Sequence, residues 1–302
     1  MIAALAGGVG AARFLEGLVA VVDPAEVVAI VNTGDDAVFH GLHVSPDLDS
    51  ILYALAGLSD EIRGWGRADE SWHALESAAA FGGADWFRLG DRDVGLHLVR
   101  TELLRAGTPL SAVTAQLVEH AGLDLTLLPA TDDELRTWLD TPAGSFHFQE
   151  WFVARGHRDE VDAVRYVGAD AATAAPGTVE ALRDAELILI APSNPYVSIG
   201  PILAVAELEA ALRSRTAPVV AVSPLIGGRA VKGPADRMLA RLAGGTSPAH
   251  VASCYAGLID ALVLDEADAH DVENLAVRPV ITKTLMSDAD ASRRLAEAVL
   301  AA

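Results

Sequence analysis

The sequence is poor in the residues that build disulfides, cysteine-based zinc sites and basic binding surfaces. Among 302 residues there is one cysteine, Cys254, so an intrachain disulfide and a zinc site made of several cysteines are excluded. We expect Cys254 to be a small core residue, as free cysteines usually are. Lysine occurs twice, and 42 acidic residues outnumber 22 basic ones to give a net charge of −20. Such an acidic chain repels phosphate backbones and anionic lipids, which argues against nucleic-acid and membrane partners.

Aromatic residues and long uncharged apolar segments are also scarce. Aromatics make up 5% of the chain, whereas apolar residues, many of them alanine, reach 51%, which favours helices packed on a buried sheet. No uncharged apolar run attains the ~20 residues of a membrane span. The apolar segment 1–22 contains a Gly-Gly-Val-Gly run and is interrupted by Arg13 and Glu16, unlike a signal peptide. We therefore predict a cytoplasmic protein.

The order of the apolar segments predicts an α/β fold. Residues 1–6 are expected to form a strand, 11–22 a helix and 27–31 a second strand, and this order implies a parallel sheet. The C-terminal half repeats the pattern, with strands expected at 187–191, 219–222 and 262–264 and helices at 178–184, 202–213, 235–242, 250–257 and from 287 onward. We predict a doubly wound, mostly parallel, Rossmann-like sheet.

Between these halves the apolar periodicity becomes helical. Residues 50–122 are predicted to be a helical insert, with helices at 71–81, 94–106 and 110–121. Residues 136–141 and 145–153 flank a Pro-Ala-Gly turn and are predicted to pair as a hairpin. We interpret residues 1–302 as a single α/β enzyme unit that contains this insert.

A glycine-rich turn, with Gly7, Gly8 and Gly10, joins the first strand to the first helix. Glycines at such a place let the backbone N–H groups and the helix dipole approach a phosphate closely. Arg13 stands where the dinucleotide fingerprint has its last Gly or Ala, and no Gly-Lys-Ser/Thr follows, so neither that fingerprint nor a P-loop is present. The alternative is a tight turn that binds nothing.

Four carboxylates follow within fifteen residues, directly after the second strand: Asp35, Asp36, Asp47 and Asp49. The carboxyl end of such a strand is where open α/β sheets bind ligands. Carboxylates of this kind hold Mg²⁺ through one or two direct ligands together with substrate phosphates. The alternative is that Asp36 and Asp47 only cap helices or turns.

Three further segments carry polar groups suited to a phosphorylated or oxygen-rich ligand. Arg88 precedes the turn 89–93, and guanidinium groups bind phosphates and ring oxygens, although a solvated ion-paired turn has the same composition. Ser193 and Asn194 end a predicted core strand between two prolines. Lys232 lies in another glycine-rich loop, where it suits a phosphate or is simply exposed.

Together these motifs resemble, over essentially the whole chain, the family of 2-phospho-L-lactate transferases (CofD/FbiA-type) of coenzyme F-420 biosynthesis. The segments that carry the resemblance are 7–13, 32–36, 45–49, 89–93 and 191–195. Singly none of them is specific. Gly-Trp-Gly at 64–66 and Phe-Gln-Glu-Trp at 148–151 resemble the actinobacterial phosphoenolpyruvate transferase branch in particular.

The resemblance implies a reaction in which the ribityl hydroxyl of the deazaflavin FO attacks the substrate-side phosphorus of a guanosine diphosphate derivative and GMP leaves. It also implies a Mg²⁺ requirement and a homodimer, and it leaves open whether the donor carries lactate or enolpyruvate. By similarity Asp35 and Asp49 would be catalytic, with Asp35, Asp47 and Asp49 serving the metal. The residues implied to bind FO are Asp49, Arg88 and His40, and those implied to bind the nucleotide are Gly7, Gly8, Gly10, Arg13, Ser193, Asn194 and Lys232.

Two other functions fit parts of the pattern. A nucleotide-sugar-binding regulatory protein of the same superfamily resembles the chain at the glycine turn, but has a glycine- and serine-rich run after its paired aspartates, where residues 37–41 read Ala-Val-Phe-His-Gly. An NAD(P) oxidoreductase is disfavoured by Arg13. Phosphoryl-type transfer depends on positioning and charge neutralisation more than on covalent catalysis, and clustered aspartates without a nucleophile triad suit it.

Overall fold

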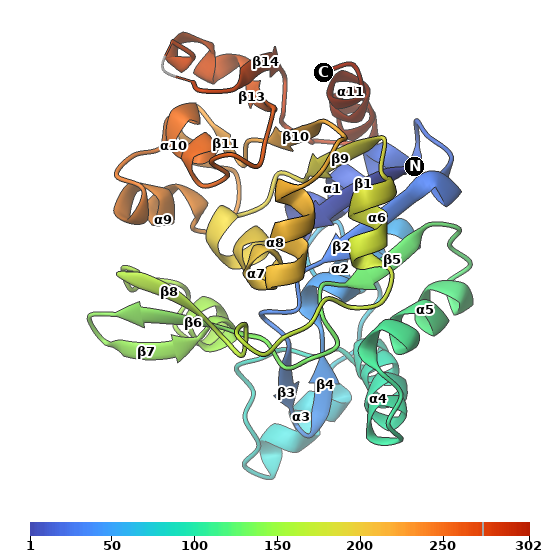
Figure 1. The fold of residues 1–302 in the computed structure, drawn as a ribbon. Coiled ribbons are helices and arrows are strands. Elements are labelled where there is room, and N and C mark those ends of the chain that lie inside the picture. Colours follow the sequence, from blue (N-terminus) through green and yellow to red (C-terminus); the bar gives the residue numbers. More distant parts are fainter. Residues whose placement is uncertain (274) are drawn as a thin grey trace.

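A computed structural model describes residues 1–273 and 275–302 and confirms the predicted α/β fold (Figure 1). Its centre is a seven-stranded sheet in the order β14-β13-β10-β9-β1-β2-β5, in which every neighbouring pair is parallel. The strands, in chain order, are β1 (Ile2–Ala6), β2 (Val27–Val31), β5 (Thr126–Pro129), β9 (Leu187–Ile190), β10 (Val219–Val222), β13 (Ala261–Asp265) and β14 (Arg278–Thr282).

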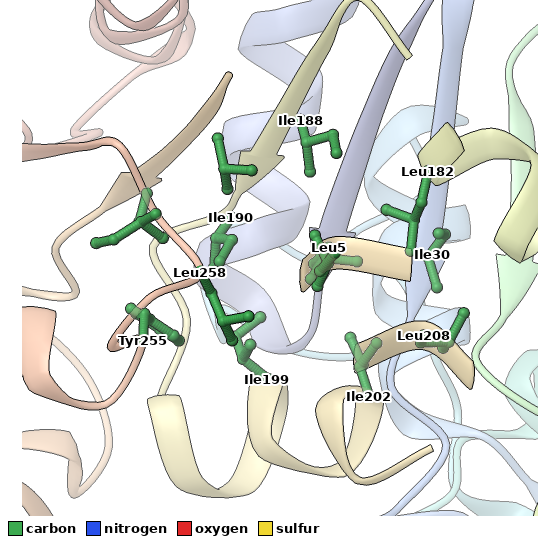
Figure 2. Packing of buried hydrophobic residues seen from close by; sticks show 14 of the residues in the cluster. Leu5, Ile30, Leu182, Ile188, Ile190, Ile199, Ile202, Leu208, Tyr255 and Leu258 are labelled. Atoms are coloured by element: carbon green, nitrogen blue, oxygen red, sulfur yellow. The ribbon is translucent and has the colours of Figure 1, made fainter. Parts of the chain in front are cut away.

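The central strands are apolar on both faces because helices cover both. In β1, Ala3 and Leu5 face one hydrophobic cluster, whereas Ala4 and Ala6 face the other. Figure 2 shows the first cluster, where Leu5 packs near Ile199 and Ile202. That face is covered by α6 (Thr178–Asp184), α7 (Gly200–Ala204), α8 (Ala206–Arg213), α9 (Ala235–Leu242) and α10 (Pro248–Ser253). The other is covered by α1 (Gly8–Val19), α2 (Pro46–Leu55), α5 (Leu110–His120) and α11 (Ala289–Leu300).

The strand order changes direction at the middle of the sheet, and this positions the site. From β1 the chain builds outward to β2 and β5, then returns to place β9 on the other side of β1 and continues to β14. Open α/β sheets bind ligands in the crevice outside the carboxyl ends of the strands at such a point. Residues 7–10 follow β1 and residues 191–195 follow β9, so both predicted ligand-binding turns meet there.

Smaller elements surround this crevice. A hairpin of β3 (Ala37–Phe39) and β4 (Leu42–Val44) lies with α3 (His73–Ala80) at the bottom of Figure 1, and α4 (Asp91–Arg105) lies beside them. An antiparallel sheet of β6 (Arg136–Thr141), β7 (Gly144–His147) and β8 (Ala163–Val167) lies at the left. The remaining elements are the pair β11 (Leu225–Ile226) and β12 (Arg229–Ala230), the 3₁₀ turns η1 (Pro24–Glu26) and η4 (Glu266–Asp271), and the π-helices η2 (Glu150–Ala154) and η3 (Pro195–Ile199).

Two local predictions are wrong. The second hairpin strand, expected over 145–153, ends at His147, and the chain turns into η2, which buries Trp151 in a separate apolar cluster with Leu139 and Met238. The helix expected over 202–213 is two helices, α7 and α8, which meet at Val205, where the backbone is extended, and the segments on either side are bent by 91°. In addition, α2 begins at Pro46, before the expected start of the insert, and packs in the core against the sheet.

In the described part of the chain, no single helix combines the length and the apolar composition of a membrane span. The bent pair 195–204 and 206–213 meets that criterion when its two segments are taken together.

Candidate active site

A cavity of about 810 Å³ opens over the carboxyl ends of β1 and β9. It brings together nearly all the residues singled out in the sequence: Gly7, Gly8, Gly10, Arg13, Asp35, Asp47, Asp49, Arg88, Ser193, Asn194 and Lys232 line it. His40 does not belong to this lining. It lies exposed in the turn between β3 and β4, with a left-handed backbone (φ 51°).

The glycine turn packs against the segment that follows β9. Gly8 has φ +77°, a conformation that glycine adopts without strain, and a Cβ built on it would meet Ser198 Oγ at 3.7 Å. A Cβ on Gly10 would lie 2.6 Å from the carbonyl oxygen of Pro192, so this glycine allows α1 to approach the end of β9. Ser193 Oγ donates to the carbonyl of Gly7 at 2.8 Å, which fastens the two turns together.

Asp35 and Asp47 share one amide donor. Asn32 Nδ2 donates to Asp35 Oδ1 at 3.2 Å and to Asp47 Oδ2 at 2.9 Å, and Gln149 Nε2 donates to Asp35 Oδ2 at 3.0 Å. Both carboxylates are buried, at 3% and 6% exposure. Burial, with the charges of Asp47 and Asp36 adding to it, holds the pKa of Asp35 well above its ordinary value, and burial raises the pKa of Asp47 to about 6.

Asp36 and Asp49 have different surroundings. Asp36 Oδ2 accepts from Ser45 Oγ at 2.7 Å and lies 3.1 Å from His43 Nε2, and among the described residues its buried Oδ1 has no hydrogen-bond partner. Asp49 is bonded through both oxygens to the fully buried Arg100 of α4. The cluster therefore holds one carboxylate neutralised by a guanidinium, beside Asp35 and Asp47, which are bonded to amides.

The donor set around Asp35 and Asp47 fits Mg²⁺ shared with a ligand. In residues 1–273 and 275–302, no three His, Cys, Asp or Glu side chains are arranged to hold a metal ion by themselves. A Mg²⁺ ion that keeps waters and binds one or two carboxylates plus substrate phosphates needs no such trio. Asp35 and Asp47 accept hydrogen bonds from the same atom, Asn32 Nδ2, so their carboxylates lie close together, and neither has a cationic partner within the described chain. These two side chains would therefore hold the metal.

We predict that Asp47 makes the metal-free protein less stable as pH rises. Its pKa is raised by burial from 3.8 to about 6, so its stabilising, protonated form is fully present below pH 3.8 and is lost through pH 6. Between pH 4 and 7.5 the wild type should lose roughly 2 kcal/mol of unfolding free energy relative to Asp47→Asn. Urea unfolding of both proteins in EDTA measures this difference. Parallel pH curves would contradict it.

Trp86, Phe87 and Arg88, which precede α4, line the cavity together with Arg63, and Trp72 and Phe39, outside the lining, pack against these side chains. The Trp72 ring contacts two guanidinium groups: the guanidinium carbon of Arg88 lies 4.4 Å from the ring centroid, and that of Arg63 lies 5.0 Å from it. Phe39 and Phe87 stack with centroids 3.7 Å apart, and Trp86 meets them edge-on. Flat rings and forked cations of this kind suit a planar ligand that carries oxygens.

The other predicted ligand-binding side chains are partly committed to the protein. Arg13 Nη1 donates to the carbonyl of Met286 at 2.9 Å, which ties the start of α1 to the segment before α11. Asn194 Oδ1 accepts from Tyr196 N at 2.9 Å and so caps η3. Lys232 is exposed and lies against Gly64, where its Nζ would be 2.3 Å from an added Cβ. Lys232 and Gly64 therefore bring the two loops above the cavity into contact.

Several residues of the site were not assigned in the sequence. Asn32 and Gln149 lie within quoted motifs, but their bonds to Asp35 and Asp47 depend on tertiary structure. Arg100 and His97 lie inside a predicted helix, where charged side chains usually face solvent. The available signal is their spacing with Asp93, at positions that share one face of a helix.

The amino-acid sequence matches the model of one protein family over residues 2–300, described as "2-phospho-L-lactate transferase CofD". It is 43% identical over 308 residues to a phosphoenolpyruvate transferase of Streptomyces coelicolor, covering 99% of this chain and 97% of that protein. The proteins of the same name from Mycolicibacterium smegmatis and Mycobacterium tuberculosis are 42% and 41% identical, with at least 96% of each chain covered.

Among solved structures, a member of the UPF0052 family from Bacillus halodurans has a similar fold. Its crystal structure at 2.60 Å resolution superimposes with a TM-score of 0.66, covering 99% of this chain and 98% of that one. The two sequences are 18% identical, so the likeness concerns the fold alone.

Proposed function

Because the chain belongs to the 2-phospho-L-lactate transferase CofD family, we propose that it transfers a phosphoenolpyruvyl or 2-phospholactyl group from a guanosine diphosphate donor to the ribityl hydroxyl of the deazaflavin FO. GMP is the leaving group, and a phosphodiester is formed in the biosynthesis of coenzyme F-420. The alternative, a nucleotide-sugar-binding regulatory protein, has the same need for a phosphate-binding turn but no need for an acceptor pocket.

The observation that carries the proposal is the continuity of the cavity. The turn from Gly7 to Gly10, which suits a diphosphate, lines the same cavity as Trp86 and Arg88, which suit a flat oxygen-bearing ring. The carboxylates lie beside both groups: a Cβ added at Gly7 would be 2.7 Å from Asp47 Oδ2, and Asp49 is bonded to Arg100 of α4, which begins just after Arg88. A nucleotide donor and a tricyclic acceptor therefore meet at the carboxylates.

Each group of residues would have a distinct role in an in-line transfer. The acceptor oxygen attacks the substrate-side phosphorus, the bond from that phosphorus to the bridging oxygen breaks, and this oxygen leaves with GMP, while the hydroxyl proton is released to water. Asp49 accepts the hydrogen bond of the attacking hydroxyl and orients it. Asp35 and Asp47 would hold Mg²⁺, which would supply positive charge against the donor's diphosphate. Arg88 and the rings beside it bind FO, and the glycine turn with Ser193 binds the phosphates. The homodimer that the resemblance implies and the cytoplasmic location predicted from the composition stay predictions.

A mass-spectrometric assay tests the function. Purified protein is incubated with FO, Mg²⁺ and either the enolpyruvyl or the lactyl guanosine donor, and the products are weighed. We expect one phosphodiester of FO together with an equal amount of GMP, and the preferred donor identifies the substrate. Binding of a UDP-sugar, with no product from either guanosine donor, would instead favour the regulatory alternative.

Replacing Arg88 by alanine should separate acceptor binding from donor binding. The guanidinium bonds FO and stacks on Trp72, so its loss should weaken FO binding about tenfold, or about 1.4 kcal/mol, and leave GDP affinity near wild type. Titrations of the two ligands measure this. Arg92→Ala is the matched control, because Arg92 is exposed on α4 outside the cavity lining. Equal loss of both affinities in Arg88→Ala would indicate misfolding and contradict the assignment.

A further inference from the structure

Helix α4 packs with its polar side inward. Its buried side chains include Asp93, His97 and Arg100, whereas Leu98 and Val99 on the opposite side are 55% and 48% exposed. An ordinary surface helix buries its apolar residues and exposes its charges. Burying a charge costs several kcal/mol unless it is paired and hydrogen-bonded. The inward face of α4 must therefore have polar partners, and it finds them on α2.

The main partner is Asp49. Arg100 Nη1 donates to Asp49 Oδ2 at 3.0 Å, and Nη2 donates to Oδ1, so the guanidinium forms a bidentate pair with the carboxylate. The backbone N–H of Ser45 also donates to Asp49 Oδ2, at 3.3 Å. Two-pronged pairing fixes the plane of a carboxylate as well as its position. Asp49 lines the cavity, so its fixed plane decides where its free lone pairs point.

His97 extends the contact along α4. Arg100 Nη1 lies 3.3 Å from His97 Nδ1, which must present a lone pair to this donor, so the ring proton is on Nε2. His97 Nε2 is 3.2 Å from Asp93 Oδ1, and the same oxygen accepts from the hydroxyl of Tyr53. Tyr53 lies one helical turn after Asp49 in α2. The polar chain thus connects α4 to α2 at two successive turns, with Asp49 at one end.

Resting on the proposed function, we propose that Arg100 and His97 are positioning residues that hold Asp49 toward the acceptor hydroxyl and outside the metal site. Arg100 already neutralises Asp49, so this carboxylate has little attraction left for a cation. Asp35 and Asp47 carry no such partner in the described residues and keep that attraction. The four carboxylates are then divided by their neighbours: two for the donor's charge and one for the acceptor, with Asp36 bonded to Ser45 behind them.

The N-terminal end of α4 links this contact to the acceptor pocket. Glu70 accepts from the backbone N–H groups of Arg92 and Asp93, both at 2.8 Å, and so caps the helix. Arg88 lies directly before that cap. FO bound at Arg88 and the carboxylate held by Arg100 are therefore positioned by the same helix.

A double-mutant cycle tests the positioning role. Arg100→Lys keeps the charge but loses the fork, and should lower kcat about tenfold while Mg²⁺ half-activation stays within about twofold. In an Asp49→Asn background, the same change should alter kcat by less than about twofold, because the group it positions is gone. Arg105→Lys, on the exposed side of α4, is the matched control and should leave kcat unchanged.

Two further measurements keep the proposal testable if Arg100→Lys folds poorly. His97→Gln should retain more activity than His97→Leu, since glutamine keeps a polar group beside Asp93, whose Oδ1 lies 3.2 Å from His97 Nε2. Calorimetry of Mg²⁺ binding to the GDP complex should give an affinity within about twofold of wild type for Asp49→Asn, and at least about tenfold weaker for Asp47→Asn.

The possible outcomes distinguish a failure of the positioning role from a failure of the proposed function. Independent, fully multiplicative effects of Arg100→Lys and Asp49→Asn in an active enzyme would overturn the positioning role alone. A loss of Mg²⁺ affinity in Asp49→Asn equal to that in Asp47→Asn would place Asp49 in the metal site and overturn it too. A wild-type enzyme inactive with FO and both donors would overturn the proposed function, and this inference with it.

Discussion

Asp35→Asn is expected to lower turnover about a hundredfold or more, which corresponds to about 2.7 kcal/mol or more in the barrier. Asparagine keeps the shape of the side chain and can still accept from Asn32 or Gln149, but it carries no charge to hold a metal against the donor's diphosphate. The fold should remain intact. Burial already disfavours the charged form of Asp35, as its raised pKa shows, so the neutral variant should be at least as stable as the wild type.

Single-turnover rates with donor and FO, together with thermal unfolding, measure both parts of this prediction. Asp124→Asn is the matched control, because Asp124 is exposed in the turn before β5 and outside the cavity lining. A wild-type rate for Asp35→Asn would remove this residue from the mechanism. A low rate accompanied by a large loss of stability would show instead that the charge supports the fold.

The central part of the fold could be predicted because its strands are short apolar runs bounded by turn residues. The strands predicted at 27–31 and 219–222 have the same bounds in the structure. The edge strands β5 and β14 were not predicted. β14 carries Arg278 and Pro279 and is half exposed, and a strand paired on one side needs no continuous apolar run. Edge strands therefore give a weak signal in the sequence.

The two wrong predictions have a common cause in tertiary packing. The apolar residues of 145–153 suit a strand, but Trp151 gains more by entering the cluster around Leu139, and the chain coils into η2 to bring it there. The segment 202–213 has a continuous helical periodicity, and Val205 is nevertheless extended so that residues on both sides of the bend, Ile202 and Leu208, enter one core. Local propensity is a weak guide where packing decides.

The residues of the candidate site also fall into two groups, those that could be predicted from the sequence and those that could not. Gly7, Asp35 and Ser193 could be proposed from the sequence because each follows a predicted strand, and the carboxyl ends of parallel strands share one edge of the sheet. Arg100 could not, because its inward direction depends on a tertiary bond to Asp49 of α2, 51 residues away in the sequence. The division between metal-facing and acceptor-facing aspartates depends on such neighbours, and the spacing of the aspartates carries no information about it.

Removing divalent metal with excess EDTA is expected to lower turnover about a thousandfold or more, roughly 4 kcal/mol in the barrier. The donor's diphosphate must enter beside Asp35, Asp36 and Asp47 in a chain with a net charge of −20. Two of the arginines that line the cavity are already bonded to other groups of the protein. Arg13 is bonded to the carbonyl of Met286, and Arg63 is paired with Asp60 at 2.9 Å.

We expect this requirement to act through Asp35 and Asp47, because an ion between their carboxylates and the phosphates would neutralise the negative charge of both. Returning Mg²⁺ should restore the full rate, whereas Ca²⁺, which takes more ligands in a looser geometry, should restore less. EDTA saturated with Mg²⁺ controls for effects of the chelator itself. In Asp47→Asn, half-activation should need at least about tenfold more Mg²⁺, because one of two protein ligands is lost. Full activity in excess free EDTA would show that the side chains alone neutralise the donor, and the role given to Asp35 and Asp47 would be wrong.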